Sequence, residues 1–91
     1  MRRERVQKSD AAMTAVYRKL LADLDDEHKP LIEKAQRAWV VFRDAACELD
    51  ASQALGGSMS RMLELDCLSA MTDMRVKDLN LVRKTLADFL R

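Results

Sequence analysis

The sequence has few of the residues that interrupt helices. Its 91 residues contain two glycines and one proline, and only 4% of them are aromatic. Alanine, leucine, methionine, lysine and arginine dominate instead, and these residues favour helices, whereas β-branched and aromatic residues favour strands. Hydrophobic residues make up 48% of the chain and charged residues 34%, a balance typical of a globular protein. We therefore expect a single all-α domain over residues 1–91.

Motifs of catalysis and cofactor binding are missing as well. The chain has one histidine, His28, and it shows no glycine-rich phosphate loop, nucleophile elbow or metal-binding histidine pair. Two cysteines and one histidine are too few ligands for a zinc site. The acidic run over residues 23–27 lacks the glycine of a calcium loop. We therefore expect no enzyme activity, no bound metal and no cofactor.

The sequence also lacks a long apolar run and a strong excess of one charge. No segment approaches the roughly 20 apolar residues that span a bilayer. The opening residues 1–9 begin with basic residues but have no apolar core, so no signal peptide is visible. Residues 1–19 are mainly basic and residues 20–66 mainly acidic, with a formal net charge of +1 overall. A nucleic-acid domain needs a basic face with aromatics, so we interpret the basic start as a solvated terminus and expect no nucleic-acid partner.

Apolar periodicity predicts two helices before the glycines. The first covers about residues 10–27, with Ser9 or Asp10 as its N-cap. The second begins at Pro30, which suits a first helical turn, and ends near residue 54. The apolar stripe of the second helix consists of Leu31, Ala35, Ala38, Trp39, Phe42, Ala46 and Leu49.

A third helix is expected after the Gly56-Gly57 break. It begins at about Ser60, and its stripe includes Leu65, Leu68, Thr72, Leu79, Val82, Leu86 and Phe89. A bend near Asn80, giving a fourth short C-terminal helix, is the alternative. The simplest assembly is an antiparallel three-helix bundle in which the stripes meet in one core.

Cys47 and Cys67 allow one intramolecular pairing. A disulfide between them would stabilise the fold by roughly 3 kcal/mol on the loop-entropy model. The alternative is a pair of buried thiols that act as small apolar residues. The spacing is not that of a CxxC motif, so a redox-active dithiol is not indicated.

Polar residues share a face with the first cysteine. Gln36, Arg43 and Cys47 fall on one line of the second helix, and Arg75 lies two turns after Cys67. One interpretation is that these polar side chains satisfy backbone carbonyls and carboxylates such as Asp44. The other is that they shape a surface for a partner.

These residues resemble the LprI-type family of small secreted bacterial proteins. The shared pattern has a Tyr-x-x-Leu helix, the run A-Q-R-A-W-x-x-F-R-D-A-x-C, then G-G-S, then C-L and T-x-x-R. In this chain it is carried by Tyr17, Leu20, residues 35–47, Gly56, Gly57, Ser58, Cys67, Leu68, Thr72 and Arg75. The resemblance covers about residues 13–79. Family members usually carry an N-terminal signal, and often a further cysteine pair, which this chain does not show.

The resemblance implies a location, a disulfide and an activity. We expect an envelope or extracellular protein whose signal peptide has been removed, with a Cys47–Cys67 disulfide and a lysozyme-inhibitor activity. The motif residues for which we expect structural roles are Gln36, Trp39, Arg43, Asp44, Gly56, Gly57, Thr72 and Arg75.

We expect a protein partner, and the first hypothesis is that this partner is lysozyme. Lysozymes are usually basic, so acidic groups would favour binding. The candidate partner-binding carboxylates are Asp25, Asp26, Glu48 and Asp50. The alternative function is a structural or assembly module of the envelope with no lysozyme activity.

Overall fold

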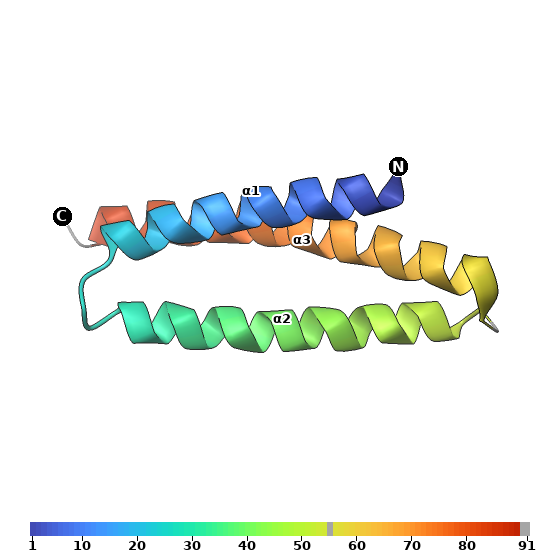
Figure 1. Ribbon diagram of the computed structural model, residues 1–91. Helices are drawn as coiled ribbons and strands as arrows, with labels where there is room; N and C mark the ends of the chain where they lie inside the picture. The colour runs from blue at the N-terminus through green and yellow to red at the C-terminus, as the bar shows by residue number, and fades with distance from the viewer. Residues whose placement is uncertain (55, 90–91) are drawn as a thin grey trace.

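The computed structural model describes residues 1–54 and 56–89 and contains three helices. They are α1 (Arg2–Asp23), α2 (Lys29–Ser52) and α3 (Gly57–Phe89). Consecutive helices run in opposite directions along a rod of 51 × 22 × 16 Å (Figure 1). The prediction of an all-α antiparallel three-helix bundle is confirmed.

Helix α1 begins eight residues earlier than its apolar pattern predicted. Ser9 and Asp10 lie inside the helix, so the prediction that one of them caps it is wrong; Met1 occupies the N-cap position. The first two turns were missed because their contacts are polar: Arg2 Nε donates to Asp66 at 3.0 Å, and the buried Ser9 donates to Asp73 at 2.5 Å. Arginine, glutamate, lysine and glutamine there have good helix propensity even without an apolar stripe.

The turn between α1 and α2 is held by Asp25 and His28. An oxygen of Asp25 accepts the backbone N–H of His28 at 2.9 Å and lies 2.6 Å from the imidazole Nδ1. His28 is the N-cap residue of α2, and Pro30 occupies the first turn as predicted. A proline is tolerated there because its missing N–H would have no intrahelical partner.

Two glycines allow the chain to reverse between α2 and α3. Gly56 and Gly57 have φ angles of 91° and 74°, a left-handed conformation that residues with a side chain rarely adopt. Helix α3 begins at Gly57, three residues before its predicted start, and continues through Asn80 to Phe89. The alternative of a fourth helix is therefore wrong within the described residues, since no glycine or proline interrupts this stretch.

Helix α3 holds the bundle together because both other helices pack against it. Helices α1 and α2 are more separated from one another (Figure 1). The core lies toward the end with the α1–α2 turn and consists of Met13, Leu20, Leu24 and Leu79. Partly buried apolar residues surround it: Val16, Tyr17, Ile32, Trp39, Val76, Val82 and Leu86.

Only part of the predicted apolar stripe of α2 faces the core. Leu31, Phe42 and Leu49 are 63%, 62% and 69% exposed, whereas Gln36 and Cys47 are buried. At 3.6 residues per turn, Phe42 points roughly 140° away from Cys47. Once Cys47 faces α3, Phe42 must therefore point to solvent, and the prediction of a single core formed by all three stripes is wrong for this helix.

Candidate functional site

The Cys47–Cys67 disulfide is present and joins α2 to α3. The two Cα atoms lie 5.4 Å apart, and Cys47 is 1% exposed. The bond lies in the half of the bundle away from the α1–α2 turn, where the apolar core is thin. It therefore stabilises the part of the hairpin that has the fewest buried apolar side chains.

Arg43 connects all three helices. Its Nη1 lies 3.4 Å from Asp10 Oδ1 on α1 and 3.3 Å from Thr72 Oγ1 on α3. Its Nε donates to Asp44 at 3.0 Å, and Nη2 lies 2.9 Å from the same oxygen. The arginine side chain is only 14% exposed. A planar guanidinium suits this position because it can donate in several directions at once.

Gln36 makes a second connection between the three helices. Its Oε1 accepts a hydrogen bond of 3.0 Å from Arg75 Nε on α3. Its Nε2 donates to the sulfur of Met13 on α1 at 3.4 Å. Burial lowers the pKa of Arg75, because removing the guanidinium from water disfavours its charged form.

Trp39 lies beside both arginines. The guanidinium carbons of Arg43 and Arg75 are 5.4 and 5.5 Å from the centre of its ring, which is within the range of cation–π attraction. We call Gln36, Trp39, Arg43, Thr72 and Arg75 the polar centre. Among the described residues, no buried side-chain nitrogen or oxygen lacks a hydrogen-bond partner. The buried polar atoms of the polar centre therefore have partners, either within it or on Asp10, Met13 and Asp44, and the arrangement favours stability over chemistry.

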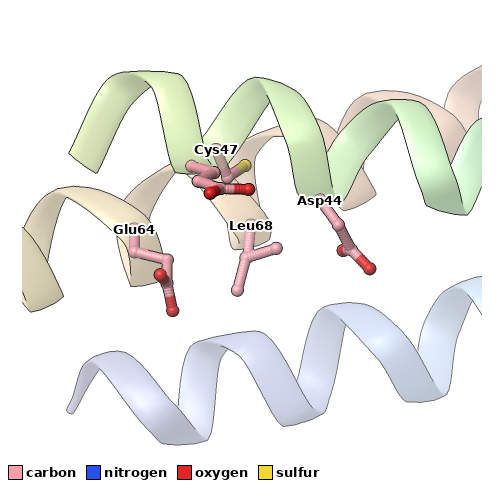
Figure 2. A pocket seen from close by; sticks show the side chains of 5 residues that line it. Asp44, Cys47, Glu64 and Leu68 are labelled. Carbon is pink, nitrogen blue, oxygen red and sulfur yellow. The ribbon is translucent and has the colours of Figure 1, made fainter. Parts of the chain in front are cut away.

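A hollow with acidic walls lies beside the disulfide. Its volume is about 360 Å³, and it is lined by Asp44, Cys47 and Glu48 of α2 and by Glu64 and Leu68 of α3. Asp44, Glu64 and Leu68 project from α2 and α3 toward α1 (Figure 2). We call this feature the acidic hollow. Its carboxylates can attract a positively charged group.

The carboxylates of the acidic hollow differ in whether they have an ion-pair partner. Asp44 is paired with Arg43. Glu48 and Glu64 have no ion-pair partner within the part of the chain that the structure describes. A cationic partner would therefore find its strongest attraction at these two glutamates.

The predicted partner-binding carboxylates do not form one group. Asp25 contacts His28, and Asp26 lies 3.6 Å from Lys29 Nζ, both at the α1–α2 turn. The hydrogen bond from His28 lowers the pKa of Asp25, and the same contact raises the pKa of His28. Glu48 and Asp50 lie near the other end of α2, roughly 30 Å along the helix.

Several residues of these two sites were not assigned to them from the sequence. Asp10 and Met13 reach the polar centre from α1, and Glu64 and Leu68 line the acidic hollow. The four-residue spacing of Glu64 and Leu68 places them on one helix face, and this could have been predicted from the sequence. Nothing in the sequence links Asp10 to Arg43, because they are 33 residues apart.

Two further observations concern the described residues only. No group of three or more histidine, cysteine, aspartate or glutamate side chains there could hold a metal ion. Of the helices described, none combines the length and apolar character needed to cross a membrane.

Comparison with known proteins identifies the family. A 72-residue region is 43% identical to an uncharacterized protein of Rhizobium meliloti strain 1021, covering 76% of this chain and 51% of the relative. A 65-residue region is 38% identical to the uncharacterized protein YecT of Escherichia coli K12, covering 67% of this chain and 40% of that protein. The chain thus spans about half the length, or less, of these relatives, and no solved structure matches it. The profile described as "Lysozyme inhibitor LprI" matches residues 2–79, and the chain therefore belongs to the LprI family.

Proposed function

We propose that this chain acts outside the cytoplasm as a lysozyme inhibitor. The family match over residues 2–79, with its description as a lysozyme inhibitor, carries this proposal. The Cys47–Cys67 disulfide supports the location, because such bonds form and persist in oxidising compartments. The protein would act by binding, without catalysis.

The acidic hollow is the surface we assign to the basic enzyme. Negative groups steer a positively charged protein toward them and fix its orientation in the complex. The nearby disulfide holds α2 and α3 in place, so few groups need to become ordered on binding. A lysine or arginine of lysozyme would then approach Glu48 and Glu64.

We assign the binding role to one subset of the four predicted carboxylates. Asp25 and Asp26 already contact His28 and Lys29, and these neighbours reduce their attraction for a further cation. Glu48 lines the acidic hollow, whereas Asp50 lies two residues further along α2, points to a different side of the helix and does not line the hollow. Glu64, which belongs to the acidic middle of the sequence, lines the same hollow from α3.

Inhibition of cell-wall hydrolysis by purified, oxidised protein tests the proposal. We expect inhibition of a basic lysozyme at micromolar concentration and roughly tenfold weaker inhibition by the Glu64→Gln variant, since one charge-assisted contact is removed. Asp26→Asn is the matched control and should inhibit as the unmodified chain does. Absence of inhibition at micromolar excess of the unmodified protein would contradict the function. Equal weakening by both variants would contradict the assigned surface.

A second candidate function is an envelope assembly module with no lysozyme activity. The exposed apolar residues of α2 favour it, because an uncovered apolar helix face is typical of a contact with another protein. A pull-down from periplasmic extract that recovers one stoichiometric partner, together with unchanged lysozyme activity, would support this function over inhibition.

A further inference from the structure

The outward side of α2 carries a regular apolar pattern. Apolar residues recur there at alternating steps of four and three: Leu31, Ala35, Ala38, Phe42, Ala45 and Leu49. All six are exposed, and we call them the outer seam. With 1.5 Å per residue, the outer seam extends along roughly 27 Å of the helix.

This spacing is the heptad repeat of coiled coils. Two helices bury such a seam against one another, each side chain fitting between those of the facing helix. Neither α1 nor α3 covers the outer seam, since Leu31, Phe42 and Leu49 are all more than half exposed. The side chains of the outer seam can therefore be buried only against another molecule.

The outer seam is also nearly palindromic about residue 40. An antiparallel second copy of α2 would place Leu31 opposite Leu49, Ala35 opposite Ala45, and Ala38 opposite Phe42. The bulky phenylalanine would thus face an alanine, which leaves room for its ring. In a twofold-symmetric interface, each such contact occurs twice.

Charged residues beside the outer seam favour the same arrangement. Lys34, Val41 and Glu48 follow one another at seven-residue steps along one edge of it. In an antiparallel coiled coil, these equivalent positions face each other, so Lys34 lies opposite Glu48 of the second copy and Val41 lies opposite itself. Within the described part of the chain, neither Lys34 nor Glu48 is in an ion pair.

A parallel arrangement lacks this complementarity. It would bring the edge with Lys34 and Glu48 against the other edge of the partner's seam, whose residues are Ile32, Trp39 and Ala46. Those residues are apolar and partly buried against the same molecule. The charges would then have no partners of opposite sign.

We propose that the outer seam is a homodimer interface in which two copies of α2 pack antiparallel about a twofold axis near residue 40. The interface is formed by a second copy of this chain, and it does not depend on lysozyme binding. Glu48 lies at the border between the outer seam and the acidic hollow, so its pairing with Lys34 of the second copy leaves Glu64 as the glutamate of the hollow that lysozyme would contact. Molecular mass, and not inhibition, is therefore the readout that isolates the dimer.

Sedimentation equilibrium of the full oxidised chain tests the proposal over about 1 µM to about 1 mM, the range in which moderate dimers dissociate. We expect a monomer–dimer equilibrium. Phe42→Glu should weaken dimerisation roughly tenfold or more, because it places one charge in each of two apolar layers. Leu81→Glu on α3 is the matched control, since Leu81 is 64% exposed, and it should leave the dimer unchanged.

A charge exchange tests the antiparallel register. Lys34→Glu and Glu48→Lys should each weaken dimerisation about fivefold by bringing like charges together, and the double variant should restore it. Lys19→Glu on α1 should have no effect. A monomer at every concentration, an unchanged mass for Phe42→Glu, equal dissociation by Leu81→Glu or failure of the double variant to restore dimerisation would each overturn the proposal. So would a monomeric protein in which Phe42→Glu abolishes lysozyme binding, since the outer seam would then serve that partner.

Discussion

Single polar side chains of the polar centre hold the three helices in one arrangement, a role that apolar residues have in larger bundles. Arg43 contacts Asp10, Asp44 and Thr72, and its guanidinium lies near the ring of Trp39. Burying a charge is costly unless hydrogen bonds and opposite charges compensate it. The geometry of these contacts therefore selects one packing of the three helices, because a shifted helix would leave the guanidinium without acceptors.

The contribution of the Arg43 guanidinium contacts to stability can be measured with a conservative substitution. Arg43→Lys keeps the charge but cannot reach three acceptors on three helices, so we expect the free energy of unfolding to fall by about 1–2 kcal/mol. Urea denaturation followed by circular dichroism measures this quantity. Arg37→Lys, at an exposed position of the same helix, is the control and should change stability little. Equal effects of the two substitutions would show that the contacts of Arg43 contribute nothing specific.

The contact between His28 and Asp25 gives the α1–α2 turn a pH dependence. The pKa of His28 is raised, so its contribution to stability is fully present below its unfolded value of 6.5 and is lost as the pH rises through the folded value. The pKa of Asp25 is lowered, so its contribution is present above its unfolded value of 3.8 and is lost as the pH falls through the folded value. The contact therefore stabilises the turn most between pH 3.8 and 6.5.

The single histidine makes this effect measurable by NMR. We expect the imidazole of His28 to titrate above 6.5 in the unmodified chain and closer to 6.5 in the Asp25→Asn variant. Asp26→Asn removes a neighbouring charge without touching the imidazole contact, and it should shift the titration less. An unchanged His28 pKa in Asp25→Asn would mean that the contact is absent in solution.

In α2, one covalent bond decides which face of the helix is buried. The disulfide turns Cys47 toward α3, and Gln36 and Arg43 follow because they lie on the same line of the helix. The more apolar face, with Phe42, is left exposed. Hydrophobicity alone would favour the opposite rotation.

Removal of the disulfide should weaken the bundle strongly. The bond closes a loop with a sequence separation of 20, for which the loop-entropy model gives about 3 kcal/mol. We expect the Cys47→Ser, Cys67→Ser double variant to lose about this much free energy of unfolding, as measured by urea denaturation. Reductant should destabilise the unmodified chain and leave the double variant unchanged. Equal stability of oxidised and reduced protein would contradict the expectation.

The fold is a thin rod along which the stabilising contacts are unevenly distributed. Apolar packing dominates toward the α1–α2 turn, and the polar centre and the disulfide stabilise the rest. A small domain buries too little apolar surface to dispense with such additions. The long sides of the rod also provide the surfaces on which we place lysozyme and the second copy.

The proposed dimer predicts the shape of the particle in solution. Residue 40 lies near the middle of α2, which itself runs along most of the 51 Å rod (Figure 1). Two antiparallel copies would therefore lie side by side, so we expect small-angle X-ray scattering to show a doubled mass with little increase in maximum dimension. The monomeric Phe42→Glu variant is the control. A dimer of about twice the length would indicate end-to-end association instead.

Local features of the sequence are enough to predict the helical class, the number of helices, the break at Gly56 and Gly57, and the family. These features are local: helix propensity, apolar periodicity and glycine conformation act over a few residues, and the family pattern follows their order. The two cysteines allowed one pairing, and the resemblance favoured a Cys47–Cys67 disulfide over two buried thiols; the structure confirms this bond.

Contacts between distant segments set the polar start of α1, the rotation of α2 and the partners within the polar centre. The contacts of Asp10 with Arg43 and of Gln36 with Arg75 join residues 33 and 39 positions apart. Whether Phe42 is buried or exposed depends on where α3 lies and on the direction in which the disulfide turns α2. Such choices follow from the packing of distant segments, and no pattern within one helix encodes them.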